Sequence, residues 1–218
     1  MKSLSSACAL ALGLSLSAAI PVAEAQHSDG AMAHSSTATT VAPKLHAAMR
    51  ALWQGHIDHT RAYAVAVKAG NAAAANKAAD DVVANAKQIA NAVAGFYGAD
   101  AGKGMLTLLA GHWGGVKAMT DAEKSGDKAA HAKALQDLTS NATAISKFLA
   151  GANPNLPETA VDSLMMMHIG DHEAQIAEIM AGDKAAEAKT WTHMQAHMNV
   201  LADALSGAIA KQFPAKAT

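Results

Sequence analysis

Cysteine is nearly absent from this sequence, and the single one, Cys8, lies within the first ten residues. Those residues have the features of a secretory signal. Lys2 supplies a basic start, an apolar stretch covers residues 7–20, and Ala23-Glu24-Ala25 matches the A-x-A pattern of a peptidase site. Removal of a signal peptide at 1–25 would leave a mature chain without cysteine, which excludes both a disulfide and a thiolate metal site.

An excess of basic charge is also lacking. The 17 Lys and Arg residues are balanced by 18 Asp and Glu residues, which gives a formal charge of -1. Binding of nucleic acid depends on clustered Lys and Arg, so we exclude that class of partner. No second apolar run of spanning length follows the signal. We therefore predict a periplasmic or secreted protein with no membrane span in the mature chain.

Alanine, leucine and lysine dominate from residue 44 onward, which is typical of helices, and the few glycines and prolines fall at regular intervals. Residues 26–43, in contrast, are small and polar and have no apolar periodicity. We predict a flexible arm there, with His27, Met32 and His34 in it. The remaining residues, 44–214, are sufficient for one helical domain of ordinary size.

A spacing of 56 residues relates three parts of the chain. A leucine is followed four residues later by a histidine three times, which gives His56, His112 and His168 the same register. The same spacing relates three Gly-Asx pairs, three lysines and three further glycines: Gly70-Asn71, Gly126-Asp127 and Gly182-Asp183; Lys77, Lys133 and Lys189; Gly95, Gly151 and Gly207. Four features in one register predict three tandem copies of one unit, at 44–99, 100–155 and 156–214.

Each unit has its Gly-Asx pair near the middle. Glycine can close one helix and the Asx side chain can cap the next, so each unit is predicted to be an antiparallel αα-hairpin. The predicted fold class is all-α, with three tandem 56-residue hairpin repeats in a six-helix bundle or a short helical stack. Helices are expected at about 44–69, 71–96, 101–125, 127–151, 157–181 and 183–212.

The third unit contains two HxxxH pairs. In a hairpin that turns between Gly182 and Asp183, His168 lies at the height of His197, and His172 lies at the height of His193. Both pairs continue apolar seams, so all four imidazoles are expected to face the core. Four such imidazoles predict a metal site, and neutral imidazole is a ligand for zinc, copper and nickel.

Several other side chains are candidate auxiliary ligands. Methionine sulfur is a soft ligand that favours Cu(I), which draws attention to Met165 and Met198, although methionine at helical spacing is also ordinary core filler. In the arm, His27 and His34 are secondary candidates for metal capture. Three further histidines have no evident partner and are predicted to be solvated: His46, His59 and His131.

The first two units provide an internal comparison. At the positions of His168 and His197 they have a histidine and an asparagine, namely His56 with Asn85 and His112 with Asn141. A buried imidazole opposite an amide is well served by a hydrogen bond, so we predict that these two pairs are structural. The same reading applied to the third unit gives an alternative, in which its histidines form a polar network in the core.

Motifs of catalytic sites are missing. The sequence has no G-x-S-x-G element and no C-x-x-C-H haem attachment motif, and residues 44–214 contain none of the E-x-x-H pairs of di-iron centres. A noncovalent haem between two histidines is a weaker alternative. Four histidine ligands would also leave no general base for hydrolysis. The sequence therefore predicts a protein that is not an enzyme.

A resemblance to a known group of proteins can be stated on these residues. The segment from Leu52 to His56 with Thr60-Arg61, the recurring Leu-x-x-x-His and Gly-Asp elements, and the closing Lys211-Gln212-Phe213-Pro214 resemble a loosely characterised family of small secreted or surface bacterial helical proteins. The resemblance covers residues 45 to 214 and implies a helical fold and an exported location. The family shares the His and Asn positions but not the extra histidines of the third unit, so the resemblance does not imply metal binding.

The sequence thus predicts an exported metal-binding protein for copper or zinc, acting in sequestration, tolerance or delivery. Its ligands would be His168, His172, His193 and His197. The metal ion is the predicted partner, and an envelope protein is a second candidate partner. The alternative is a non-catalytic structural or interaction module whose histidines belong to hydrogen-bond networks in the core.

Overall fold

The chain folds into six α-helices, as described over residues 42–217 in a computed structural model. The helices are α1 (Pro43–Ala69), α2 (Ala72–Tyr97), α3 (Ala99–Ser125), α4 (Lys128–Ala152), α5 (Glu158–Ala181) and α6 (Lys184–Gln212). Each end falls within two residues of the predicted limit, and the all-α prediction is confirmed. The predicted signal at 1–25 and the arm's candidates His27 and His34 lie outside the described residues.

Three tight turns of the same kind join α1 to α2, α3 to α4 and α5 to α6. Each has a glycine in the left-handed conformation, with φ of 69° at Gly70, 74° at Gly126 and 78° at Gly182. The following Asx side chain accepts a hydrogen bond from a backbone N–H in the first turn of the next helix, as predicted for Asn71, Asp127 and Asp183. These local signals fix where each helix ends and where its antiparallel neighbour begins.

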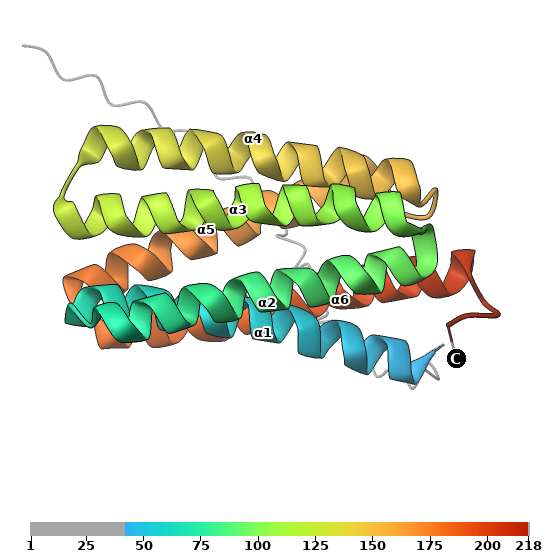
Figure 1. Cartoon of the computed structure of the whole chain (residues 1–218), viewed down its shortest axis with the longest axis horizontal. Helices are drawn as coiled ribbons and strands as arrows, with labels where there is room; N and C mark the ends of the chain where they lie inside the picture. Colours follow the sequence, from blue (N-terminus) through green and yellow to red (C-terminus); the bar gives the residue numbers. More distant parts are fainter. Residues whose placement is uncertain (1–41, 218) are drawn as a thin grey trace, which may run out of the picture. The chain divides into compact units, whose positions relative to one another are not determined.

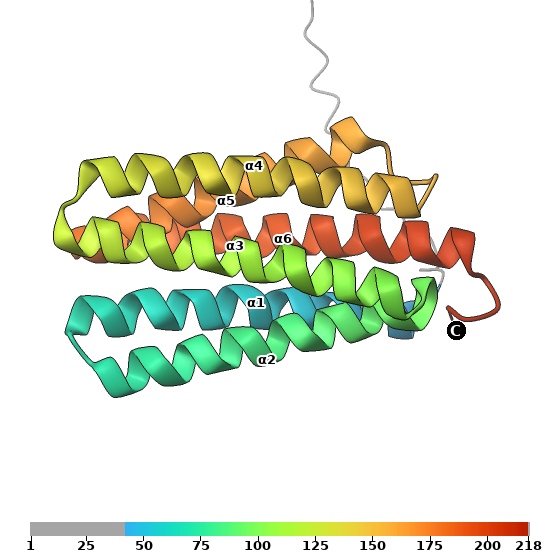
Figure 2. The same cartoon turned by 45° about the horizontal axis from the view of Figure 1, so that its top comes forward.

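The six helices form a closed bundle. Each helix packs against the next one in the chain, and α1 also packs against α6, which joins the two ends of the series (Figures 1 and 2). In addition, α1, α3 and α5 contact one another in all three combinations. These three helices are therefore inner helices, while α2, α4 and α6 lie in the gaps between them. Of the two predicted arrangements, the bundle is observed.

One apolar cluster fills the bundle and draws buried side chains from all six helices. Three of its members, Trp53, Leu109 and Met165, each lie three residues before one of the histidines in the 56-residue register. No helix within residues 42–217 is both long enough and apolar enough to cross a membrane.

An inner helix and an outer helix approach each other closely at a glycine, which has no side chain to hold them apart. A Cβ atom added at Gly115 of α3 would lie 2.6 Å from Cγ of Leu138 of α4, which is fully buried. A Cβ at the adjacent Gly114 would meet nothing within 4 Å. Gly115 therefore permits the packing of α4 on α3, whereas Gly114 is an ordinary exposed helical position.

These two neighbours form a matched pair for mutation. We expect Gly114→Ala to raise the free energy of unfolding by up to about 1 kcal/mol, because alanine is the better helix former. Gly115→Ala should lower it by about 1 to 3 kcal/mol, because overpacking outweighs the gain in helix propensity. Urea unfolding followed by circular dichroism measures both values. Equal effects of the two substitutions would contradict the close approach of α3 and α4.

Candidate metal centre

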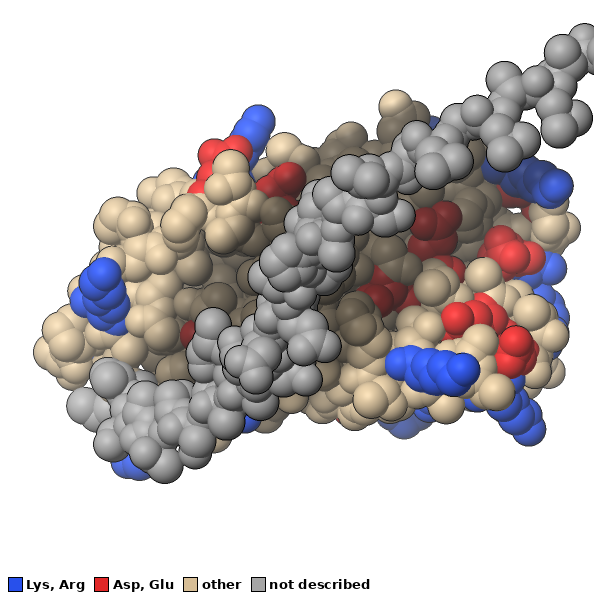
Figure 3. Space-filling model, turned by 180° about the vertical axis from the view of Figure 1, so that it is seen from behind, with Lys and Arg blue, Asp and Glu red and all other residues tan. Residues whose placement is uncertain are grey.

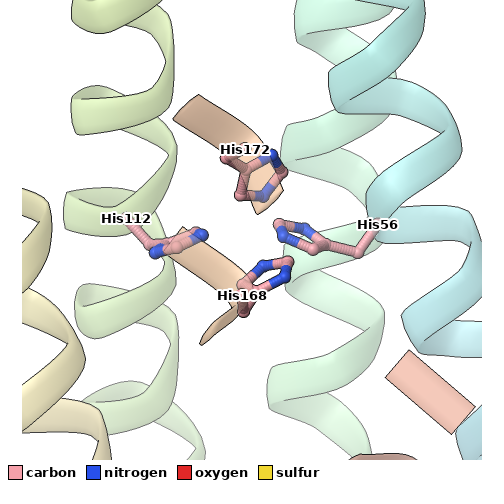
Figure 4. A group of neighbouring side chains, drawn as sticks. All are labelled: His56, His112, His168 and His172. Carbon is pink, nitrogen blue, oxygen red and sulfur yellow. The ribbon is translucent and has the colours of Figure 1, made fainter. Parts of the chain in front are cut away.

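Four imidazoles from the three inner helices meet in the middle of the bundle. His56 comes from α1, His112 from α3, and His168 and His172 from α5 (Figure 4). Each offers one ring nitrogen, and these four nitrogens all lie within 4.8 Å of one another. The four residues are between 1% and 4% exposed. Within residues 42–217 they are the only such group of possible metal ligands.

The register of the helices explains the convergence. His56, His112 and His168 each lie fourteen residues before the glycine that ends their helix, and they therefore occupy the same level of the bundle. Their helices are the inner ones, so the three side chains approach one another across the centre of the bundle. His172 follows His168 by one helical turn and lies on the same face of α5, which adds a fourth imidazole from the side of the turns.

The ring positions suit one tetrahedral ion. The six distances between the centroids of the four rings range from 4.3 to 5.9 Å, and five of them lie between 5.4 and 5.9 Å. With metal–nitrogen bonds of about 2 Å, four ligating nitrogens would lie about 3.4 Å apart, and the ring centroids about 5 Å apart. All six centroid distances lie within about 1 Å of this separation, so the cluster has the size of one tetrahedral site.

Burial keeps these imidazoles neutral. It lowers the pKa of His56 to about 3, and the nearby His112 and His59 add to that shift. It lowers the pKa of His112 to about 4, although the Asn141 side chain opposes the change. The pKa values of His168 and His172 are also lowered well below the ordinary value, first by burial and then by the other imidazoles. Neutral imidazole, with a free lone pair, is the form that binds a metal ion.

The ring nitrogens of the cluster are short of hydrogen-bond partners. Both nitrogens of His112, both of His168 and Nε2 of His172 are buried without a partner in the described part of the chain. A buried polar atom left without a partner costs about 1 to 3 kcal/mol, and most buried polar groups in proteins are paired. A metal ion would supply a partner for one nitrogen of each ring.

The observed group differs from the predicted ligand set in two of its four members. His193 has a side chain that is 58% exposed, and its Nδ1 lies 2.8 Å from Oδ1 of Asp171. His197 is buried, and its Nε2 lies 2.9 Å from the backbone carbonyl oxygen of Leu164, to which it donates a hydrogen bond. Both residues lie outside the cluster, so the grouping predicted within one hairpin is corrected to one across three hairpins.

The predicted His–Asn pairs also take a different form. The amide of Asn85 donates to the carbonyl of Leu52 at 2.9 Å, and that of Asn141 donates to Leu108 at 3.0 Å, so neither amide group is donated to a histidine. These bonds match the one from His197 to Leu164, because the residue numbers of donor and acceptor differ by 33 in each case. Asparagine in the first two hairpins and histidine in the third thus tie the outer helix to the inner one.

The remaining candidates lie elsewhere. Met165 and Met198 are buried in the apolar cluster. His46, which was predicted to be solvated, contacts Asp203 and Ser206 instead, with Nδ1 3.2 Å from Asp203 Oδ1 and 2.9 Å from Ser206 Oγ. His131 lies near two carboxylates, those of Glu123 and Glu173, at 3.7 and 3.9 Å.

Comparison with known proteins adds no identity: no protein family, no curated protein and no solved structure matches the chain. The family resemblance noted in the sequence therefore stays a prediction. What the chain can bind has to be argued from its own residues.

The lowered pKa values predict how the metal-free protein responds to acid. Unfolded histidine has a pKa of about 6.5, so between that value and the folded pKa the unfolded chain binds more protons. The free energy of unfolding should therefore fall as the pH falls below about 6.5, by up to about 1.4 kcal/mol per pH unit for each such histidine. In His112→Leu the dependence should be shallower by up to that amount down to about pH 4.

Urea unfolding between pH 4.5 and 7, with a chelator present, measures the two pH profiles. Parallel profiles for the unsubstituted protein and His112→Leu would show that His112 is protonated equally in the folded and unfolded chains, contrary to its burial.

Proposed function

We propose that the protein binds one copper or zinc ion in the cluster of His56, His112, His168 and His172, and that it holds or delivers this ion. The observation that carries the proposal is the meeting of four buried, neutral imidazoles within 4.8 Å of one another in the centre of the bundle. An all-nitrogen site of this kind suits zinc and copper, whereas magnesium and calcium prefer oxygen ligands.

The number of protein ligands favours metal binding over catalysis at the metal. Catalytic zinc sites keep one position open for water or substrate, whereas four protein ligands complete a tetrahedral ion. The four histidines are almost fully buried, which leaves little space beside the ion for a substrate. We therefore propose sequestration, tolerance or delivery of the metal and no enzymatic activity.

The proposed place of action is the cell envelope. It depends on the signal-like residues 1–25, which would direct the chain to the periplasm or the exterior. A protein that meets metal ions there before they reach the cytoplasm could bind them for protection or transfer, and an envelope protein would be the partner in delivery.

We further infer that the three hairpins are copies of one ancestral unit. The inference is supported by the shared 56-residue register, by three equivalent Gly-Asx turns and by three equivalent hydrogen bonds to Leu52, Leu108 and Leu164. In such a unit one histidine per copy would suffice to build a three-histidine centre. His172 would then be the later addition that completes four-fold coordination.

The alternative is a structural or interaction module in which the histidines only form core hydrogen bonds. Such a network would pair its polar atoms, because a partly satisfied network is less stable than an apolar core. Five ring nitrogens of the cluster have no hydrogen-bond partner among residues 42–217, which favours the metal site.

Isothermal titration of the metal-free protein with Zn²⁺, Cu²⁺ and, without oxygen, Cu⁺ tests the proposal. We expect one ion per chain. His56→Leu and His112→Leu should each weaken binding by more than about 100-fold, since even the loss of an outer-shell contact to a ligand weakens metal binding 10- to 100-fold. At 100 times the dissociation constant, the ion should add about 2.7 kcal/mol to the free energy of unfolding.

His193→Gln is the matched control, because it removes a histidine of the same chain that lies outside the cluster. Its affinity should equal that of the unsubstituted protein. Absence of binding, or binding that survives both leucine substitutions, would reject the central site and return these histidines to a structural role.

A further inference from the structure

An ion that occupies the central cluster has to cross the wall of the bundle, because its four histidines are at most 4% exposed. Two histidines of the third hairpin, His193 and His197, remain outside the cluster and have no part in the proposed coordination. Their positions relative to His168 indicate how an ion would reach the centre.

His193, His197 and His168 form a file of imidazoles from the surface to the cluster. The ring centroids of His193 and His197 are 6.4 Å apart, and those of His197 and His168 are also 6.4 Å apart. Neighbouring rings are nearly parallel, at 8° and 23°. Exposure falls along the file, since the His193 side chain is 58% exposed, whereas His197 is 5% and His168 is 1% exposed.

The spacing of the file permits an ion to pass from ring to ring. Two imidazoles on opposite sides of one ion have ring centroids about 6 Å apart when the metal–nitrogen bonds are about 2 Å long. A separation of 6.4 Å therefore lets neighbouring rings share an ion once a nitrogen of each ring is turned toward the other. The ion would never be without a nitrogen ligand in the low-dielectric interior, where a bare charge is very unfavourable.

A carboxylate lies at the outer end of the file, on a helix with an excess of negative charge. Helix α5 has five acidic residues and neither lysine nor arginine. One of the five, Asp171, contacts His193 and has its second carboxylate oxygen buried without a partner in the described part of the chain. Seen from behind, Asp and Glu side chains lie mainly in the right half of the view, where Lys and Arg side chains also occur (Figure 3).

The other two hairpins lack this file. The positions of His193 and His197 are occupied there by aspartate and asparagine: Asp81 with Asn85, and Asp137 with Asn141. Both aspartates are bound by a lysine one turn earlier, Lys77 or Lys133. The file of imidazoles from the surface to the cluster is thus a feature of the third hairpin, with His168 on α5 and His193 and His197 on α6.

We propose that metal ions enter the central site between α5 and α6, with His193 and His197 as successive transient ligands and the buried carboxylate of Asp171, beside His193, as a further ligand at the start of the route. This inference rests on the proposed metal binding and deepens it by assigning an access route. Each step exchanges one imidazole nitrogen for the next around the same ion, so no electron is transferred. His168 belongs both to the route and to the final site.

The test is the rate of metal uptake, measured by stopped flow on the purified metal-free protein with Co²⁺, whose visible absorption reports tetrahedral coordination, and with Zn²⁺ in competition. Two variants interrupt the file. His193→Gln changes an exposed side chain, and His197→Asn with Met167→Gly recreates the arrangement of Gly55 with Asn85 and of Gly111 with Asn141. His131→Gln on α4 is the matched control.

We expect both variants to take up and release the ion about tenfold more slowly, with an equilibrium affinity that stays within about threefold of the unsubstituted protein. The control His131→Gln should retain the uptake rate, the release rate and the affinity of the unsubstituted protein. Unchanged rates would overturn the route, and a lost affinity would overturn it too, because His193 and His197 would then be ligands in the final complex. If the unsubstituted protein binds no metal, the proposed function itself fails, an outcome distinct from either of these.

Discussion

The packing of α1 against α6 is the contact on which the centre of this molecule depends. Consecutive helices in an open stack would contact only their neighbours, and each hairpin would bury its apolar face separately. Closure brings α1, α3 and α5 within contact of one another, and their inward faces then share one core. Because the three hairpin turns lie at equal distances from the three registered histidines, the same closure places those histidines at one level.

The resulting cluster is unfavourable for the stability of the metal-free chain. Four imidazoles are withdrawn from water, their pKa values are lowered by burial, and five of their nitrogens have no partner within residues 42–217. Apolar side chains of similar volume would pack there without this penalty. Buried polar groups without partners in an otherwise well-packed core are typical of functional sites. A bound ion would remove their free-energy cost, because the free lone pairs of the imidazoles would bind it.

The sequence predicts the helices better than the site, and the reason is physical. Helix ends depend on local signals, such as Gly126 followed by Asp127, and all six helices are observed close to their predicted limits. The cluster depends on which inner faces meet, and no local pattern states that α1 closes on α6. The prediction from pairing within one hairpin correctly placed His168 and His172 beside other imidazoles. It named His193 and His197 as those neighbours, whereas the cluster contains His56 and His112.

A signal for His56 and His112 was nevertheless present in the sequence. Their shared 56-residue register with His168 indicates one level in any closed three-hairpin arrangement. The asparagines predicted to pair with them, Asn85 and Asn141, donate their amide N–H groups to the backbone carbonyls of Leu52 and Leu108. A glycine at position 55 or 111 leaves room for this approach, which is a tertiary detail that the spacing alone does not encode.

The cluster draws its members from positions 56, 112, 168 and 172, and an ion held there would join segments more than a hundred residues apart. Such an ion is a cross-link that closes two large loops of the chain, and because it binds the folded chain and not the unfolded one, it stabilises the fold by its binding free energy. In a domain with no cysteine among its described residues, the ion would take the place of a disulfide. Unlike a disulfide, it would form only after all three hairpins had folded and would be removed by a chelator.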